Sequence, residues 1–433
     1  MIRRARTWRA VAVLGVAGLA LAACGGDEAT DDDTDAPAET TEEMTEETGA
    51  AGGGEGDGVL TLGTLLPETG SLAFLGPPEF AGVELAVQEI NENGGVLGAD
   101  VVKIDSDSGD TTTDIATQST TRLLGEGVDA IIGAASSAVS FTVIDQVTGA
   151  GVVHFSPANT SPDFTDYDDN GLYFRTAPSD VLQGRVMGDL LVQDGNLNVA
   201  LLVLDDPYGT GLAENIQISL EAGGGQLALD PVLYPEGTDN FSAQVTQVAN
   251  AAPDAVVLIG FAETAQIVNE MIAQGVGPDA LPTYFVDGNL SNYGEDLPAG
   301  ALEGNKGTLP GAEASEEFQQ RLLEVDPALE DFSYAAESYD AAVVIALAAI
   351  AADSDAGTDI GAAIPDVTRE GEPCTTFADC VALLEAGEDI DYDGISGPIE
   401  LSDAGDPSEA TIGIFQYGAD NNYTRIDSLS GTL

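Results

Sequence analysis

The chain has very little of several residue types on which common protein chemistries depend. Its 433 residues include one histidine, three cysteines and one tryptophan, and 12 basic residues stand against 75 acidic ones. A formal net charge of −63 repels nucleic acid and anionic headgroups, so we expect no nucleic-acid partner. Too few histidines and cysteines remain for a metal cluster, and no glycine-rich phosphate loop is present. We therefore expect no metal and no cofactor.

The acidity suits solubility, including solubility in a saline medium, and a binding site for a cationic partner is the alternative. Hydrophobic residues still make up 43% of the chain, and 52 glycines supply tight turns. Such a composition is typical of an ordered protein, and the length allows two domains with separate cores.

The first 23 residues have the pattern of a secretory signal peptide. Four arginines precede an apolar run, Val11 to Ala23, that is too short to span a bilayer comfortably. The run ends in Leu-Ala-Ala-Cys-Gly, which resembles the lipobox of bacterial lipoproteins, with Cys24 as the lipid-bearing first residue after cleavage. Ordinary cleavage beside an incidental cysteine is the alternative. We expect an exported chain, anchored through Cys24 at the outer face of the cytoplasmic membrane.

Residues 24–57 follow as an acidic segment almost without large apolar side chains. Such a segment buries too little surface to offset its ordering entropy, and we interpret it as a disordered tether below the lipidated cysteine. The other two cysteines, Cys374 and Cys380, are six residues apart. In an exported chain they are expected to form a disulfide.

From residue 58 onward, buried strands alternate with amphipathic helices. Repeated strand–helix–strand units predict an α/β fold with mostly parallel sheets covered by helices on both faces. We expect a first lobe at 58–177, a second lobe at 178–305, a return to the first lobe at 306–392, and a C-terminal segment, 393–433, that crosses back to the second lobe. Two lobes joined by several crossings suggest a cleft that closes on a ligand by hinge motion.

The stretch 131–160 contains the most informative pair of turns. Ile131 and Ile132 end one strand, Ser137 stands where a helix N-cap belongs, and a second strand leads into Ser-Pro-Ala-Asn-Thr at 156–160. Both turns lie at the carboxyl edge of a parallel sheet, where ligands bind. Hydroxyl groups and free N–H groups at a helix N-terminus attract an anion, so we predict that this edge holds the carboxylate of a small ligand.

From about Val59 to its end the chain resembles the branched-chain amino-acid-binding proteins of bacterial ABC transporters, of the leucine/isoleucine/valine type. The segments that carry the resemblance are TLLPETGSLAFLGPPEFAGVELAVQEINENGG, VDAIIGAASSAVS, VVHFSPANTSPDF, YFRTAPSD, DDPYGTGLAENI, TDNFSAQVTQV, SYAAESYDA and YDGISGPIEL. The resemblance implies a two-lobed periplasmic-binding-protein fold with the ligand between the lobes. It implies a monomer that captures a small neutral amino acid and delivers it to a membrane permease, without chemistry of its own.

The resemblance also implies which residues bind the ligand. Ser137, Ala158 and Thr160 match the positions that hold the α-carboxylate and ammonium. Asp287 takes the place of a glutamate facing the ammonium, with one methylene fewer, for which a bridging water or a tighter cleft compensates. The expected aromatic and apolar walls are Tyr208, Phe261, Leu75 and Phe74. Glu263 is a spare candidate for the ammonium partner.

Several alternatives remain open at this point. Ser137 alone is compatible with a plain helix cap, Asp287 with a turn former and Tyr208 with packing. The same frame is compatible with a short amide, urea or an aromatic acid as ligand, and with a receptor ectodomain. A surface-anchored serine hydrolase is the rival of another class. It requires His154, which lies inside an apolar strand, or a lysine base, Lys103 or Lys306.

Overall fold

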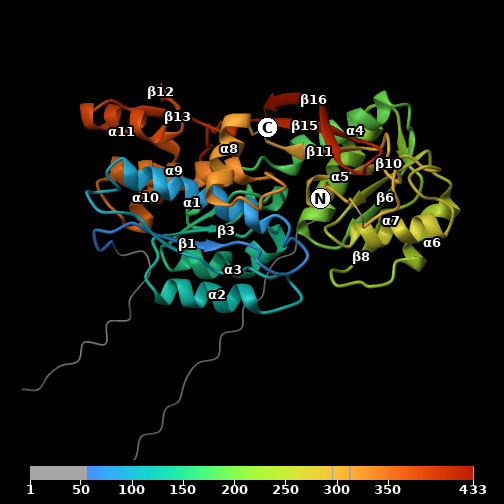
Figure 1. The fold of residues 1–433 in the computed structure, drawn as a ribbon, viewed down its shortest axis with the longest axis horizontal. Coiled ribbons are helices and arrows are strands. Elements are labelled where there is room, and N and C mark those ends of the chain that lie inside the picture. The colour runs from blue at the N-terminus through green and yellow to red at the C-terminus, as the bar shows by residue number, and fades with distance from the viewer. Residues whose placement is uncertain (1–55, 295, 312–313, 433) are drawn as a thin grey trace, which may run out of the picture. The chain divides into compact units, whose positions relative to one another are not determined.

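A computed structural model of the chain describes residues 56–294, 296–311 and 314–432 (Figure 1). All of these belong to one compact unit, Gly49–Leu433. The predicted signal peptide, Cys24 and nearly all of the tether lie outside the described residues, so the predictions for them stay predictions.

The first lobe is built on a five-stranded parallel sheet with the order β2-β1-β3-β4-β5. Its strands are β1 (Thr61–Leu65), β2 (Val102–Ile104), β3 (Ala130–Gly133), β4 (Val153–Ser156) and β5 (Tyr173–Arg175). Helices α1 (Gly76–Glu92), α9 (Ala335–Ala352) and α10 (Gly357–Ala363) lie on one face, and α2 (Ile115–Gly125) and α3 (Ser137–Gly149) on the other (Figure 1). Alternate strand residues supply the two cores: Ile132 packs with α1 and α9, and Ile131 with α2 and α3.

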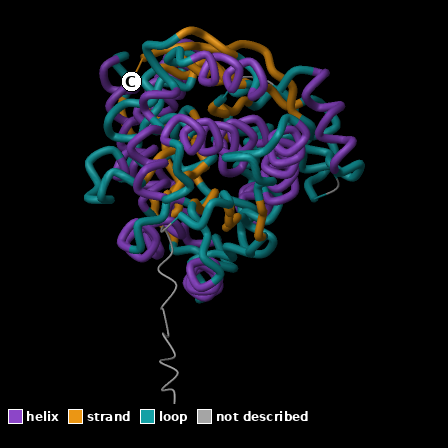
Figure 2. Tube along the Cα trace, turned by 90° about the vertical axis from the view of Figure 1, so that its left-hand side faces the viewer, coloured by secondary structure: helices purple, strands orange, loops and turns teal. Residues whose placement is uncertain are grey.

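The second lobe contains an eight-stranded sheet with the order β16-β15-β11-β10-β9-β6-β7, in which β8 also pairs with β6. Its strands are β6 (Asn198–Leu204), β7 (Gln226–Leu227), β8 (Val232–Tyr234), β9 (Ala255–Ile259), β10 (Thr283–Phe285), β11 (Lys306–Pro310), β15 (Glu409–Tyr417) and β16 (Tyr423–Thr432). Its helices are α4 (Asp180–Gln193), α5 (Pro207–Ala222), α6 (Ser242–Ala251) and α7 (Thr264–Ala273). Every residue of β9 is buried, as expected for a central parallel strand. Figure 2, viewed from the side of the first lobe, shows helices on both sides of the strands of that lobe.

The chain crosses between the lobes more than once. β11 still pairs in the second sheet, so the chain leaves that sheet after Pro310. It then forms α8 (Glu316–Val325) and α9, which pack in the core of the first lobe, as the sequence predicted. A small sheet of β12 (Glu372–Cys374), β13 (Ile390–Gly394) and β14 (Gly397–Pro398) and helix α11 (Phe377–Ala386) follow. The C-terminal segment ends in the antiparallel pair β15–β16, which joins the second sheet through β11.

Two further details of the described residues bear on the sequence predictions. The disulfide between Cys374 and Cys380 is present and joins β12 to α11. α9 is long and apolar enough to cross a membrane, and it alone among the helices of the described ranges meets that criterion. It is largely buried inside the protein, as a core helix of the first lobe.

Candidate functional site

The predicted turn after β3 begins a helix, but its cap is one residue earlier than the sequence suggested. Ser136 is the N-cap of α3, and its side chain accepts a hydrogen bond from the Val139 N–H at 3.4 Å. Ser137 is the first residue of the helix, so the prediction that Ser137 is the cap is wrong. The correction matters because a capping hydroxyl is committed to the helix backbone, whereas a hydroxyl at the first helical position is available for another partner.

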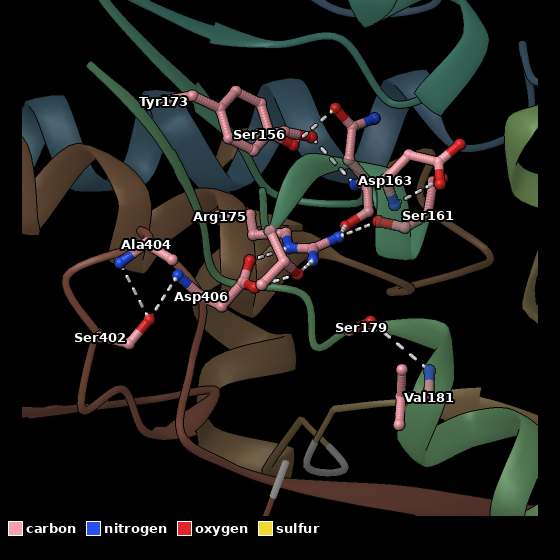
Figure 3. Close-up of polar contacts among 12 residues, drawn as sticks. Ser156, Ser161, Asp163, Tyr173, Arg175, Ser179, Val181, Ser402, Ala404 and Asp406 are labelled. Carbon is pink, nitrogen blue, oxygen red and sulfur yellow. Dashed lines mark hydrogen bonds and ion pairs between the residues drawn. The ribbon is translucent and has the colours of Figure 1, made fainter. Parts of the chain in front are cut away.

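The turn after β4 is bonded directly to the turn after β3. The Ser156 hydroxyl donates to the Ala134 carbonyl at 2.7 Å and accepts from the Asn159 N–H at 2.9 Å. The Ser161 N–H donates to Ser137 Oγ at 3.3 Å. Ser156 and Ser161 are seen in Figure 3. The two turns therefore form one hydrogen-bonded unit at the carboxyl edge of the sheet, as the sequence predicted.

A cavity of about 20 Å³ lies between this edge and the second lobe. Seven of the eight residues that the sequence singled out line it: Leu75, Ser137, Ala158, Thr160, Tyr208, Phe261 and Asp287. Phe74 does not line it, and packs instead against the large core of the second lobe. The remaining lining residues, not singled out from the sequence, are Leu72, Ala135, Ser136, Gly288 and Tyr334.

Asp287 is the acid of the cavity, and it is held from three sides. Its Oδ1 accepts hydrogen bonds from the Tyr208 hydroxyl at 2.7 Å and the Gln183 amide at 3.1 Å. Its Oδ2 accepts from the Tyr334 hydroxyl at 2.9 Å. Burial raises the pKa of Asp287, and these three donors oppose the rise by stabilising the ionised form. The backbone N–H of Gly288 also lowers the pKa, so all four hydrogen-bonding neighbours favour the negative charge that the ammonium group of a ligand would meet.

Thr160 and Ser137 offer opposite hydrogen-bonding groups to the cavity. The Thr160 hydroxyl donates to Asp180 Oδ2 at 3.1 Å, which leaves its oxygen free to accept. The Ser137 oxygen already accepts from the backbone, which leaves its hydrogen free to donate. Ser137 also stands at the N-terminus of α3, where a helix favours negative charge. The site thus presents donors at Ser137 and acceptors at Thr160 and Asp287, an arrangement complementary to a zwitterion.

The rest of the wall is apolar and aromatic. The rings of Tyr208 and Phe261 stack with their centroids 5.5 Å apart and their planes 11° apart. Leu72 and Leu75 are buried on the side of the first lobe. The hydroxyl groups of Tyr208 and Tyr334 both donate to Asp287. The rings of these tyrosines therefore present mainly apolar surface to a ligand side chain.

The two lobes make direct contacts around the cavity. The Ser71 hydroxyl donates to Glu236 Oε1 at 2.5 Å, and the Ala262 N–H donates to the Ser71 carbonyl at 3.3 Å. A cavity of about 20 Å³ is close to the space that one water molecule needs. A ligand of amino-acid size therefore enters only when the walls move apart, which is what a hinge between two lobes provides.

Comparisons with known proteins identify the fold and the family. Residues 59–418 match the profile of the family described as periplasmic binding protein. The chain belongs to this family. Leu/Ile/Val-binding protein homolog 3 of Brucella melitensis is 28% identical over 341 residues, 76% of this chain and 88% of that relative. The family resemblance drawn from the sequence is thereby confirmed.

Solved structures agree with the family on the fold. The leucine-binding protein of Thermotoga maritima superposes with a TM-score of 0.71 at 22% identity, covering 86% of this chain and 99% of that one. A solute-binding protein from R. palustris in complex with benzoate superposes with a TM-score of 0.69 at 19% identity, covering 87% and 98%. The predicted two-lobed α/β fold is confirmed, and the family is one of solute-binding proteins rather than enzymes.

The groups that a hydrolase requires lie apart from the cavity of this periplasmic binding protein. His154 is fully buried in β4, its ring meets Tyr173 edge to face, and burial lowers its pKa to about 4. Lys103 is 2.9 Å from Glu84, and Lys306 is 2.7 Å from Asp194. None of these groups lines the cavity with Ser137.

Glu263, the spare candidate for the ammonium partner, is also occupied elsewhere. Its Oε1 accepts from the Tyr234 hydroxyl at 2.7 Å and from the Phe261 N–H at 2.9 Å. It is not among the residues that line the cavity. Glu263 therefore orients the chain at Phe261 and leaves Asp287 as the acid of the cavity.

The sequence reading missed Tyr334, Gln183 and Asp180. Tyr334 directly precedes α9 and has a left-handed backbone conformation with φ of 59°. Such a conformation is uncommon for a bulky residue and often marks a functional position. A signal was available, because Tyr334 lies in the SYAAESYDA segment that carries the family resemblance.

A second buried acid near the lobe crossing makes stability depend on pH. Glu337 in α9 is buried beside Glu79 and Asp340, and burial raises its pKa to about 8. Between about pH 4.5 and 8 the unfolded chain loses this proton while the native state keeps it. The free energy of unfolding must then fall as pH rises, by about 1.4 kcal/mol per pH unit for this one group.

Urea unfolding at several pH values between 5 and 8 measures this dependence. Glu337→Gln is expected to reduce the slope by about 1.4 kcal/mol per pH unit, because it removes one proton from the native state in that range. Glu324→Gln, an exposed change on α8, is the matched control and is expected to leave the slope unaltered. An unchanged slope in Glu337→Gln would show that this carboxyl is ionised in the native state.

Proposed function

We propose that the protein is an extracytoplasmic solute-binding lipoprotein of an ABC importer. As a monomer it captures a small neutral amino acid with a branched or other aliphatic side chain and delivers it to the membrane permease. The observation that carries the proposal is the cavity in which Ser137, Thr160 and Asp287 meet between the two lobes. Ser137 and the start of α3 take the carboxylate, and Thr160 and Asp287 take the ammonium.

The ligand class is supported by the wall and by the relatives. Tyr208, Phe261 and Leu75 offer apolar surface to a side chain, while the polar groups fix the orientation of its charged end. The Brucella melitensis relative is named a Leu/Ile/Val-binding protein, and the Thermotoga maritima structure a leucine-binding protein.

The R. palustris structure in complex with benzoate keeps an aromatic acid as the second candidate ligand. The stacked rings of Tyr208 and Phe261 favour such a ligand. Asp287 disfavours it, because an aromatic acid brings no cation to a buried carboxylate. We therefore place the amino acid first. A short amide or urea, which donates hydrogen bonds without a charge, is the third candidate.

A thermal-shift screen of the amino acids, benzoate, acetamide and urea tests the proposal. A ligand that binds with a Kd of about 1 μM, or about −8 kcal/mol, stabilises the protein by about 2.7 kcal/mol at one hundred times its Kd. A rise in Tm of roughly 3 °C is expected with leucine, isoleucine or valine. Stabilisation by benzoate or urea alone would contradict the proposed ligand class. Calorimetry gives the Kd, since the only tryptophan, Trp8, lies in the predicted signal peptide.

The lipid anchor is tested by labelling cells that express the full chain with a fatty-acid analogue. We expect label on the wild-type protein and its recovery with the membrane, through acyl chains on Cys24. Cys24→Ala is expected to abolish both. The Cys374→Ala/Cys380→Ala variant keeps Cys24 and serves as the control for cysteine loss. Incorporation of label into Cys24→Ala would show that the anchor is elsewhere.

A further inference from the structure

Arg175, at the end of β5, is the only lysine or arginine among the described residues that is buried. Its Nε lies 2.6 Å from Asp406 Oδ1. Its Nη1 donates to two backbone carbonyls, those of Asn159 at 3.2 Å and Ser161 at 2.8 Å. Figure 3 shows the guanidinium group between Asp406 and Ser161.

The two carbonyls that Arg175 binds belong to the residues on either side of Thr160. The Asn159 carbonyl belongs to the peptide group directly before Thr160, and the Ser161 carbonyl belongs to the peptide group that follows Ser161, so Arg175 holds the turn on both sides of Thr160. From the opposite side, the Asp180 N–H donates to the Thr160 carbonyl at 2.7 Å. The direction in which the Thr160 hydroxyl faces the cavity therefore depends on the guanidinium group, although Arg175 does not line the cavity.

Asp406 connects the guanidinium group of Arg175 to the segment of the chain that crosses between the lobes. It lies between β14 and β15, on the segment that leads into the second sheet. Its Oδ2 accepts from the Thr165 hydroxyl at 2.6 Å, and the Arg175 N–H donates to the neighbouring Gly405 carbonyl at 3.0 Å. Gly405 has a φ of 76°, and a Cβ there would lie 2.2 Å from the Tyr173 carbonyl oxygen. A glycine is thus required for this close approach.

We propose that Arg175 and Asp406 are positioning residues for ligand binding. They hold the turn that carries Thr160 in its binding geometry. They also attach this turn to the segment between β14 and β15, which crosses to the second lobe, so the position of the turn relative to the hinge stays constant. A purely stabilising role explains the pair poorly, because a buried ion pair costs desolvation that apolar residues avoid. The inference rests on the proposed function, since it assigns the pair to the site where an amino acid binds.

The test compares Arg175→Lys with the wild-type chain. Lysine keeps the positive charge near Asp406 but lacks the planar fork that reaches Asp406 and both carbonyls together. We expect amide hydrogen exchange of peptides covering 157–161 to become at least tenfold faster in the absence of ligand. We expect the Kd for L-leucine to rise at least tenfold. Exchange in β6 and β9, in the core of the second lobe, is expected to stay as in the wild type.

Arg321→Lys is the matched control. Arg321 pairs with Glu89 in the same lobe, and none of its contacts reaches the Thr160 turn. It is expected to leave exchange at 157–161 and the Kd for L-leucine unaltered. If Arg175→Lys folds poorly, the Arg175→Met/Asp406→Leu variant removes both charges of the pair, and the same local exchange and the same loss of affinity are expected.

Two results would overturn the inference. One is wild-type exchange at 157–161 in both Arg175 variants. The other is faster amide exchange throughout the chain, with no larger increase at 157–161 than elsewhere. That result would show that Arg175 and Asp406 stabilise the whole fold and do not position the turn. A wild-type chain that fails to bind L-leucine would contradict the proposed ligand, whereas the exchange experiment without ligand still decides whether Arg175 positions the turn.

Discussion

Asp287→Asn is expected to weaken the binding of L-leucine by about 3–5 kcal/mol, or two to more than three orders of magnitude in Kd. The reason is that the ammonium of the ligand is then buried without a counter-charge. The variant is expected to fold normally without ligand, because asparagine keeps the shape of the side chain and the Tyr334 hydroxyl can turn to accept from the new amide. Calorimetric titration of both proteins with L-leucine gives the two Kd values.

Asp279→Asn is the matched control for this change. Asp279 is exposed in the same lobe, shortly before β10, and its replacement is expected to leave the Kd unaltered. If Asp287→Asn bound L-leucine as tightly as the wild type, the ammonium would have another partner. The tyrosine hydroxyls around Asp287 would then belong to a structural network rather than to the binding site.

The second large effect is expected from the double variant Ser137→Ala/Thr160→Val. It removes the hydroxyl proposed to donate to the carboxylate and the oxygen proposed to accept from the ammonium. Each change leaves a buried charge short of a partner, and together they are expected to weaken L-leucine binding by about 2–4 kcal/mol. Calorimetry under the conditions used for Asp287→Asn measures the loss.

The control variant carries the same two substitutions, Ser→Ala and Thr→Val, on an exposed helix face. Ser242 and Thr246 lie on α6, and Ser242→Ala/Thr246→Val is expected to leave the Kd unaltered. Normal binding by Ser137→Ala/Thr160→Val would mean that the two turns do not hold the charged end of the ligand. The single variants then show whether either hydroxyl contributes at all.

The sequence was sufficient to bring the two turns together. Parallel strands end at the same edge, so the residues after β3 and β4 had to be neighbours once both strands were recognised. It was less reliable for single positions, because a helix start is defined only to within a residue. The cap therefore proved to be Ser136 instead of Ser137. Of the two neighbours Phe74 and Leu75, only Leu75 lines the cavity, and Phe74 packs against the core.

The parts that the sequence did not predict depend on contacts between distant segments. Arg175 and Asp406 are separated by 231 positions, and no local pattern indicates that they form a buried pair. Tyr334 reaches Asp287 only because the chain returns to the first lobe through α9. Gln183 and Asp180 stand on α4 and look like ordinary helix residues until the lobes are packed together.

The central claim is that the cavity recognises both charges of a zwitterion. Calorimetric titration of the wild-type protein with L-leucine and with two matched analogues tests it most directly. One analogue, 4-methyl-2-hydroxypentanoate, lacks the ammonium, and the other, isopentylamine, lacks the carboxylate. L-leucine is expected to bind with a Kd of about 1 μM or below, and each analogue at least about 100-fold more weakly, since each leaves one set of buried groups without its partner. Binding of either analogue as tightly as L-leucine would contradict the account.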